Sequence, residues 1–285
     1  MSGPDWSRYA RDALAEDRAS EDATTGLLGA AARRQATGHL RSEDRCVIAG
    51  LPLFEATFRA LSDVRRFDVL VDEGKTAAKG DTIATVSAAA GTLLGAERVA
   101  LNYIQRLSGI ATVTRQAVDA VLGTQTTITD TRKTTPGLRD LEKYAVRVGG
   151  GVNHRRSLAD AVLFKDNHWA LLRASGMSLA DALATAPSGV PIQVEVETEE
   201  QLREALDANV KFLLIDNQTP STVRRWRDRA GPGVVVEASG GIHPGNVADY
   251  AQAGAHRVAM GALTHSAAAI SMRFDIELAP SGPEG

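Results

Sequence analysis

Positively charged side chains gather in one stretch of the chain, residues 130–168, among glycines and polar turn residues. The stretch contains Arg132, Lys133, His154, Arg155 and Lys165. Two runs rich in apolar residues and threonine, 126–131 and 161–164, predict short buried strands. The cations lie at or just after the carboxyl ends of these strands, and parallel α/β folds bind their ligands at that edge. We therefore expect a site for a small, highly anionic ligand that carries carboxylates, phosphates or both.

A solvated basic surface is the alternative interpretation of this stretch. Lys143 and Arg147 fit it, because they lie four residues apart on a predicted helix. The pairs 132–133 and 154–155 fit it less well, since they lie in turns beside the three glycines 149–151. A run of glycines costs backbone entropy unless the chain must turn unusually or approach something closely. We therefore favour a functional site.

Composition restricts the class of protein. The chain has 285 residues, 44% of them hydrophobic and 24% charged, as expected for a soluble globular protein with a sizeable core. The formal net charge of -3 argues against a nucleic-acid partner, because the basic segment is local. The single cysteine, Cys46, excludes an intrachain disulfide and lies in a predicted core strand. The sequence shows no membrane span and no signal peptide, so we expect a cytoplasmic protein without a membrane partner.

The N-terminal part reads as a separate α+β block with antiparallel strands. Helices are predicted over residues 5–17 and 52–62, strands around 39–49, 67–71 and 82–87, and a polar loop from 16 to 25. Helical periodicity follows from 96 to 123 and is interrupted at Ser108-Gly109, which allows two helices or one kinked helix. Arg98 and Arg106 lie on this element, and the pattern alone indicates only exposed helical arginines.

From residue 126 onward, strand, loop and helix alternate, which predicts a parallel sheet. The six predicted strands cover 126–131, 161–165, 191–197, 211–216, 233–239 and 257–261. A capping box begins at Thr198, and Thr219-Pro220 marks another helix start. An open doubly wound sheet and a closed barrel both fit, although the absence of an early Gly-x-Gly-x-x-Gly turn disfavours a Rossmann fold.

Acidic residues at two strand ends indicate a metal site. Gln193, Glu195 and Glu197 share one face of their strand, and Asp216 ends the next. Inward-facing carboxylates are costly unless they meet a cation. We expect Glu195 and Asp216 to hold Mg²⁺ together with water and substrate phosphate oxygens. Salt bridges to Lys133 or Lys165 are the alternative, and the two interpretations are compatible.

Glycine turns after the last two strands predict a phosphate site. Ser239-Gly240-Gly241 and Gly261-Ala262 would present backbone N–H groups and a helix N-terminus to an anion. His265 could add a donor or could be a capping or packing residue. Phosphoribosyl pyrophosphate with an aromatic acid fits such a site. No Ser-His-Asp or Cys-His arrangement is evident, and displacement at a sugar carbon needs none, because stabilising its oxocarbenium-like transition state is electrostatic work.

These residues resemble the quinolinate phosphoribosyltransferase family, the decarboxylating nicotinate-nucleotide pyrophosphorylases of NAD biosynthesis. The matching motifs occur in family order from about residue 96 to 266. They are Glu97-Arg98, Leu101-Asn102, Leu107-Ser108-Gly109-Ile110-Ala111-Thr112, Asp130-Thr131-Arg132-Lys133-Thr134, Gly149-Gly150-Gly151-Val152-Asn153-His154-Arg155, Lys165-Asp166-Asn167-His168, Val194-Glu195-Val196-Glu197, Asp216-Asn217, Ser239-Gly240-Gly241 and Gly261-Ala262-Leu263-Thr264-His265-Ser266. The N-terminal block matches more loosely, through Glu16-Asp17 and Asp22-Ala23-Thr24-Thr25.

The resemblance implies an N-terminal α/β sandwich, residues 1–110, and an open, incomplete α/β barrel, residues 111–266, followed by a segment, 267–285, that returns to the N-terminal domain. It also implies a homodimer with shared active sites, in which Arg98 reaches the partner's site. The resemblance also implies a role for each residue of the site. Arg132, His154, Arg155 and Lys165 bind the quinolinate carboxylates, Lys133 and Lys165 lie near the pyrophosphate, Glu195 and Asp216 serve Mg²⁺ and the ribose hydroxyls, and Ser239, Gly240, Gly261 and His265 hold the 5′-phosphate. The catalytic set would be Lys133, Lys165, Glu195 and Asp216.

The chain departs from the family pattern at three places. Arg156-Ser157 replaces an apolar residue and a glycine, Glu21 replaces a glycine, and Phe164 replaces a small aliphatic residue. Because Arg156 follows the predicted carboxylate site, a paralogue acting on another aromatic acid is the second hypothesis. A non-catalytic ligand-sensing or metal-handling relative is the third, and the complete set of cations disfavours it.

Overall fold

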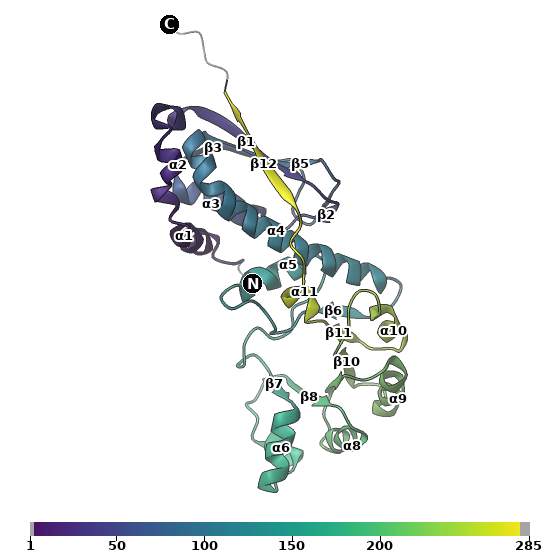
Figure 1. Cartoon of the computed structure of the whole chain (residues 1–285). Helices are drawn as coiled ribbons and strands as arrows, with labels where there is room; N and C mark the ends of the chain where they lie inside the picture. Colours follow the sequence, from purple (N-terminus) through teal and green to yellow (C-terminus); the bar gives the residue numbers. More distant parts are fainter. Residues whose placement is uncertain (1–2, 280–285) are drawn as a thin grey trace. The chain divides into compact units, whose positions relative to one another are not determined.

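The computed structural model describes residues 3–279, whose contacts form two compact units (Figure 1). The first unit comprises the described residues up to 112, residues 140–149 and those from 267 onward, and the second comprises 113–139 and 150–266. The predicted division at 110 and 266 stays a prediction.

The first unit is built on a four-stranded antiparallel sheet in the order β12-β1-β5-β3. Its strands are β1 (Gln35–Ser42), β3 (Val64–Val69), β5 (Thr82–Ala89) and β12 (Met272–Leu278), and β2 (Cys46–Val47) pairs separately with β4 (Thr76–Ala77). Its helices include α1 (Trp6–Glu16), α2 (Ala23–Gly26), α3 (Leu51–Leu61) and parts of α4 (Ala90–Ala120) and α5 (Arg139–Val148), with short 3-10 turns at Ala19–Glu21 and Gly29–Arg33. Phe54 and Phe58 are fully buried. Their rings pack against Phe274 of β12, so the C-terminal strand is part of this core.

Two local predictions for this unit need correction. The strand predicted over 39–49 is two strands, because β1 ends at Ser42 and the chain turns before β2. The polar loop predicted over 16–25 contains helical turns, and the Asp22 carboxylate begins α2 by accepting the backbone N–H groups of Thr24 and Thr25. Cys46 is buried as predicted.

The predicted interruption at Ser108-Gly109 does not break the helix, since α4 runs through both residues. Ser108 is fully buried, and its hydroxyl bonds to the backbone N–H and carbonyl of Ala49 at 3.1 and 3.3 Å. A Cβ atom on Gly109 would lie 2.0 Å from the carbonyl oxygen of Ala268. Both residues therefore serve close packing, which local sequence signals for helix breaking do not distinguish.

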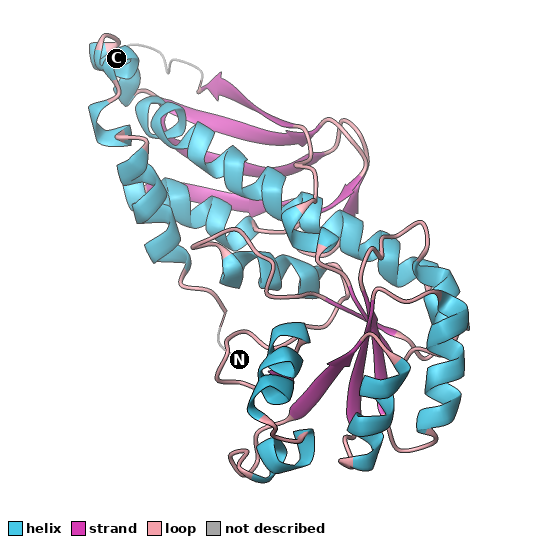
Figure 2. Ribbon diagram, turned by 60° about the horizontal axis from the view of Figure 1, so that its bottom comes forward, coloured by secondary structure: helices cyan, strands magenta, loops and turns pink. Residues whose placement is uncertain are grey.

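The second unit is a six-stranded parallel sheet in the order β6-β11-β10-β9-β8-β7. The strands are β6 (Thr127–Thr129), β7 (Val162–Phe164), β8 (Ile192–Val196), β9 (Phe212–Asp216), β10 (Val235–Ser239) and β11 (Arg257–Ala259). The helices are α6 (Asp166–Ser175), α7 (Leu179–Ala184), α8 (Glu199–Asp207), α9 (Pro220–Ala230), α10 (Val247–Gln252) and α11 (Ala262–His265), and Figure 2 shows helices alongside the parallel strands. β6 and β7 lie at opposite edges of the sheet, so this is the open, incomplete α/β barrel expected from the family pattern.

Helix caps fix where the strands of this unit end. The Thr198 hydroxyl accepts the N–H of Gln201, and the Gln201 side chain accepts the N–H groups of Glu197 and Thr198, which confirms the predicted capping box. Thr219 caps α9, with Pro220 as its first residue. Within residues 3–279, no helix combines the length and the apolar character that crossing a membrane requires.

Candidate active site

A pocket of about 310 Å³ lies at the carboxyl ends of the parallel strands, within the second unit. Eight of the predicted site residues line it, and seven of these are charged or titratable, namely Arg132, Lys133, His154, Arg155, Lys165, Glu195 and Asp216. Ser239 lines it as well, and Leu163, Leu214 and Ala259 add apolar surface. Side chains far apart in the sequence thus meet because parallel strands end at one edge.

Arg132 and Arg155 form a wall with two neighbouring positive charges. Burial lowers the pKa of Arg155, and the charge of Arg132 acts in the same direction. The Nη1 atom of Arg155 donates to the carbonyl of Ala161 at 2.9 Å, and the Nε atom of Arg132 is buried without a hydrogen-bond partner among the described residues. Two like charges held this way favour an anionic ligand between them.

The turns that carry this wall are held by Asp130 and Arg139. Asp130 is fully buried, and its carboxylate accepts the backbone N–H of His154 at 2.8 Å and the amide of Asn153 at 2.5 Å. Arg139 donates to the hydroxyl of Thr134 and to the carbonyls of residues 132 and 156. Both residues therefore position the cations without lining the pocket.

His154 is held at both ring nitrogens. Its Nδ1 atom accepts the backbone N–H of Arg155 at 2.8 Å, and its Nε2 atom lies 2.9 Å from Oε1 of Gln193 and 3.3 Å from Oε1 of Glu237. A backbone N–H only donates and the Gln193 oxygen only accepts, so these contacts assign the ring proton to Nε2. His154 is therefore held in the pocket wall by contacts at both ring nitrogens.

The same pocket is also lined by an acidic group, Glu195 and Asp216. The Nζ atom of Lys165 is 2.6 Å from Oε2 of Glu195, so the predicted salt bridge forms with Lys165. Burial raises the pKa of Glu195, the bond to Lys165 opposes that rise, and the charges of Asp216 and Asp166 add to it. A carboxyl group with this balance is stabilised as an anion by any further cation.

The carboxylates of the acidic group lie close enough together to hold Mg²⁺. Oxygen atoms of Glu195, Glu197 and Asp216 lie within 4.8 Å of one another. Carboxylate oxygens are the donors that Mg²⁺ prefers, and one or two suffice when water and substrate phosphates complete the shell. The predicted pair fits a cation, and Glu197 joins it from just beyond the end of β8.

The predicted phosphate site forms a second pocket of about 290 Å³ beside the first, sharing Thr131, Lys133, Ser239 and Ala259 with it. It brings Gly240, Gly261 and His265 together. Thr264 does not line this pocket. Its hydroxyl donates to the carbonyl of Lys133 at 2.7 Å, which fixes the loop after β6. The predicted helix N-terminus is weak, because α11 has only four residues, so the glycine turns provide the main cradle.

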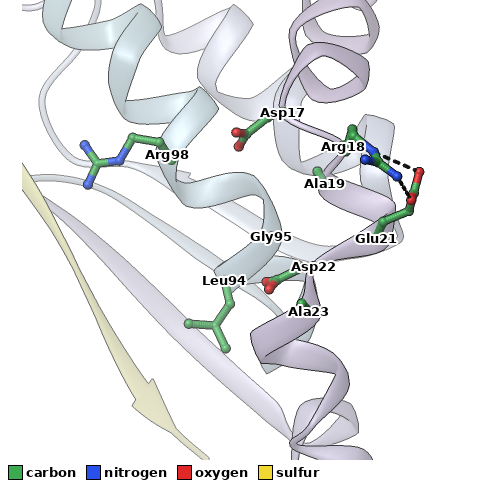
Figure 3. Close-up of a pocket in the computed structure, with 9 residues that line it drawn as sticks. All are labelled: Asp17, Arg18, Ala19, Glu21, Asp22, Ala23, Leu94, Gly95 and Arg98. Atoms are coloured by element: carbon green, nitrogen blue, oxygen red, sulfur yellow. Dashed lines mark hydrogen bonds and ion pairs between the residues drawn. The ribbon is translucent and has the colours of Figure 1, made fainter.

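Arg98 lies elsewhere, on α4 within the first unit. It lines a pocket of about 410 Å³ with Asp17, Asp22 and Gly95, and its side chain points away from the Arg18–Glu21 ion pair (Figure 3). The role of Arg98 in a partner's site stays a prediction.

Some residues were misjudged or missed from the sequence. Arg106, expected to be an exposed helical arginine, donates to buried Glu142 at 2.8 Å and to the carbonyl of Ala267 at 2.7 Å. Lys143, assigned to a solvated surface, is buried. Asp130 and Glu237 were not predicted as site residues. The alternation along β10 was the one signal for Glu237, since it places this side chain on the same face as Ser239.

Known proteins are similar to this chain over most of its length. The family model described as "Quinolinate phosphoribosyl transferase, C-terminal domain" matches residues 110–275, and the corresponding N-terminal domain matches residues 22–108. A nicotinate-nucleotide pyrophosphorylase [carboxylating] of Mycobacterium leprae is 44% identical over 84% of this chain and 86% of its own. A probable enzyme of the same name from Bacillus subtilis is 42% identical over 84% and 82%. The crystal structure of nicotinate-nucleotide pyrophosphorylase from Ehrlichia chaffeensis matches with a TM-score of 0.88 at 34% identity, over 95% of this chain and 98% of that one.

Proposed function

The chain belongs to the quinolinate phosphoribosyltransferase family, and we propose that the two strand-end pockets carry out the reaction of that family. The enzyme transfers phosphoribosyl from phosphoribosyl pyrophosphate to quinolinate, and it releases pyrophosphate and carbon dioxide in forming nicotinate mononucleotide, a step of de novo NAD biosynthesis. One observation carries the assignment to these pockets: a cationic wall, an acidic group and paired glycine turns meet at one sheet edge.

The cationic wall is suited to quinolinate. Arg132 and Arg155 would bind its two carboxylates and orient the ring, and Lys165 lines the same pocket. His154 is better suited to shaping the wall than to pairing with a carboxylate, since both of its ring nitrogens are engaged within the protein.

The acidic group and the glycine turns are suited to phosphoribosyl pyrophosphate. Glu195 and Asp216 would hold Mg²⁺ and the ribose hydroxyls, and Lys133 and Lys165 would lie near the pyrophosphate. Bound Mg²⁺ would neutralise charge on the departing pyrophosphate. Ser239, Gly240, Gly261 and His265 would hold the 5′-phosphate in the second pocket.

The chemistry requires positioning more than a protein nucleophile. The lone pair of the pyridine nitrogen forms a bond to the ribose carbon, and the electron pair of the broken carbon–oxygen bond leaves with pyrophosphate. Carbon dioxide then departs, the electron pair of its bond stays on ring carbon 2 beside the positive nitrogen, and that carbon takes a proton from water. The protein's contribution is to hold both anionic substrates in line for attack.

A different aromatic acid has no support from the pocket. Arg156 is exposed, its backbone N–H donates to Asp160 at 2.8 Å, and it does not line either strand-end pocket. Phe164 packs edge-on against His168 and does not line them either. The two departures that suggested a shifted substrate therefore lie outside the linings of both pockets.

The direct test is to incubate the protein with quinolinate, phosphoribosyl pyrophosphate and Mg²⁺. We expect nicotinate mononucleotide and carbon dioxide in equal amounts, and no turnover when Mg²⁺ is chelated. A folded protein that consumes another pyridine or benzene acid in preference to quinolinate would show that the substrate assignment is wrong. A homodimer and a cytoplasmic location complete the proposal, as the family resemblance and the sequence predict.

A further inference from the structure

Glu237 is a carboxylate whose placement the binding roles above do not explain. It lies on β10 in register with Leu214 of β9, which in turn is in register with Glu195 of β8. All three line the larger of the two strand-end pockets, so apolar Leu214 has a carboxyl group on either side. Glu195 is paired with Lys165 at 2.6 Å, whereas Glu237 has a longer contact, 3.3 Å, with Nε2 of His154.

The cost of keeping Glu237 in this position is high. The residue is fully buried, and neither of its carboxylate oxygens has a hydrogen-bond partner among the described residues. Buried polar groups in folded proteins nearly always have such partners, and a buried charge without compensation is strongly unfavourable. A group left unsatisfied in the wall of a ligand pocket is a candidate for a role in the reaction.

His154 does not satisfy the hydrogen-bonding needs of the Glu237 carboxylate. Its Nε2 atom lies 3.3 Å from Oε1 of Glu237, but the same nitrogen is closer to the Gln193 oxygen, at 2.9 Å. Because Nδ1 accepts the backbone N–H of Arg155, Nε2 is the ring nitrogen that can donate, and its shorter contact is with Gln193. Gln193 and the backbone already fix this tautomer, so orienting the imidazole does not account for Glu237.

The proposed reaction creates a positive charge that would compensate the Glu237 carboxylate. Quinolinate enters as a dianion with an uncharged ring nitrogen, whereas the ring is a pyridinium once its nitrogen has bonded to the ribose carbon. The sugar carbon is also cationic in the transition state. A carboxylate in the pocket wall disfavours the dianion and favours these cationic species, and such a difference lowers the barrier.

We propose that Glu237 is a catalytic carboxylate that stabilises the positive charge developing on the ribose carbon and the pyridine ring. This inference rests on the proposed function and assigns a role to a residue outside the binding set. It predicts effects of opposite sign on the two ligands, because Glu237 repels the substrate dianion and attracts the product pyridinium.

The test compares Glu237→Gln, which keeps the shape and removes the charge, with wild type. We expect kcat to fall by about 100-fold, as when one electrostatic contact to a transition state is removed. In equilibrium binding by calorimetry, we expect severalfold tighter binding of quinolinate and severalfold weaker binding of nicotinate mononucleotide. Glu237→Asp retains the charge, so it should recover most of the lost product affinity and part of kcat even if the packing changes.

Glu73→Gln is the matched control, since it changes a mostly buried carboxylate of the first unit that lines neither strand-end pocket. We expect it to leave kcat and the ratio of the two affinities unchanged. Binding of quinolinate and product that shifts in the same direction in E237Q, or a kcat equal to that of wild type, would overturn the role of Glu237. Wild-type protein that does not turn over quinolinate would instead overturn the proposed function.

Discussion

Arg155 is the residue on which quinolinate binding should depend most. Its guanidinium lines the pocket beside Arg132, and burial lowers its pKa, so this charge needs an anion. We predict that Arg155→Ala lowers kcat/KM for quinolinate by about 100-fold, the loss expected for one or two charge-assisted hydrogen bonds. Binding of phosphoribosyl pyrophosphate, measured by calorimetry, should stay near the wild-type value.

Arg156→Ala is the matched control, because it removes the same type of side chain one position along the chain, outside the pocket lining. It should turn over quinolinate at close to the wild-type rate. Equal losses in R155A and R156A would mean that the two arginines act through net charge alone and that Arg155 does not contact a carboxylate.

At the residue level, the sequence predicted the charged groups well and their supports poorly. Arg132 and Arg155 were found because cations in turns after strands have few structural explanations. Asp130 was missed because a carboxylate that receives backbone N–H groups has no local signature, and its partners lie more than twenty positions away. Arg106 was misjudged for the same reason, since exposure of a helical residue depends on what packs against the helix.

Among the connecting elements, the turn after β10 is the least tolerant of change. Gly240 has a φ of 91°, and a Cβ there would lie 2.2 Å from the side-chain oxygen and 2.5 Å from the backbone nitrogen of Asn217. Asn217 in turn donates to the Asp216 carboxylate at 2.7 Å. We predict that Gly240→Ala costs about 3 kcal/mol of unfolding free energy and weakens binding of phosphoribosyl pyrophosphate more than tenfold.

Gly241→Ala is the matched control, because it introduces backbone strain without a steric clash. Gly241 also has a positive φ, 62°, but a Cβ there would meet no atom within 4 Å. This substitution should cost about 1 kcal/mol of unfolding free energy and leave binding of phosphoribosyl pyrophosphate nearly unchanged. Urea unfolding and calorimetry on both variants check this, and similar effects on binding would argue that the contact with Asn217 is unimportant.

The start of α3 depends on a carboxylate that should make stability pH-dependent. Glu73 accepts the N–H groups of Gly50 and Leu51 and the hydroxyl of Tyr144, at 2.6, 3.0 and 2.8 Å. Burial raises its pKa above 4.5, although these hydrogen bonds oppose the rise. A raised pKa in the folded state means that its stabilising contribution is complete below 4.5 and is lost as pH rises through the folded value.

Glu73→Gln measures this contribution, because all other titrating groups are shared with wild type. We predict that the unfolding free energy of wild type relative to E73Q is highest near pH 4 and declines toward pH 8. Urea unfolding across this range is the measurement. A difference that stays constant or grows with pH would mean that the hydrogen bonds to Glu73 outweigh its burial.

Elements of the second unit were predictable because strand, cap and turn signals agree with one another there. Thr198 and Gln201 mark the start of α8 in sequence and in structure alike. In the first unit, local sequence signals conflict with the observed elements, because tertiary contacts determine where a helix continues. Gly109 resembles a helix breaker, yet it is required where α4 meets the backbone of Ala268.

For the whole molecule, alternation of strands and helices predicted a parallel sheet but could not choose between an open sheet and a barrel. That choice depends on whether the edge strands pair, and local pattern carries no information about it. In the structure β6 is paired with β11, and Val152 bridges to it on the other side, so β6 does not meet β7. Family motifs supplied the missing information, since they identify the incomplete barrel as a unit.

Dimerisation is the prediction that belongs to the whole molecule. Arg98 lines a pocket of the first unit, whereas Lys165 lines the strand-end pocket of the second. If each active site needs Arg98 of the partner subunit, then Arg98→Ala and Lys165→Ala should each be inactive alone. In a mixed dimer, one of the two sites has both residues intact and the other lacks both.

Random exchange of the two variants at equal concentration makes about half of the dimers mixed, and each mixed dimer has one intact site. Activity should therefore recover to about one quarter of wild type per subunit, provided that the two sites act independently. Native mass spectrometry of subunits that differ in isotopic labelling establishes that exchange has occurred. Complete exchange without recovered activity would show that Arg98 and Lys165 serve the same subunit's site or different functions, and it would end the shared-site proposal.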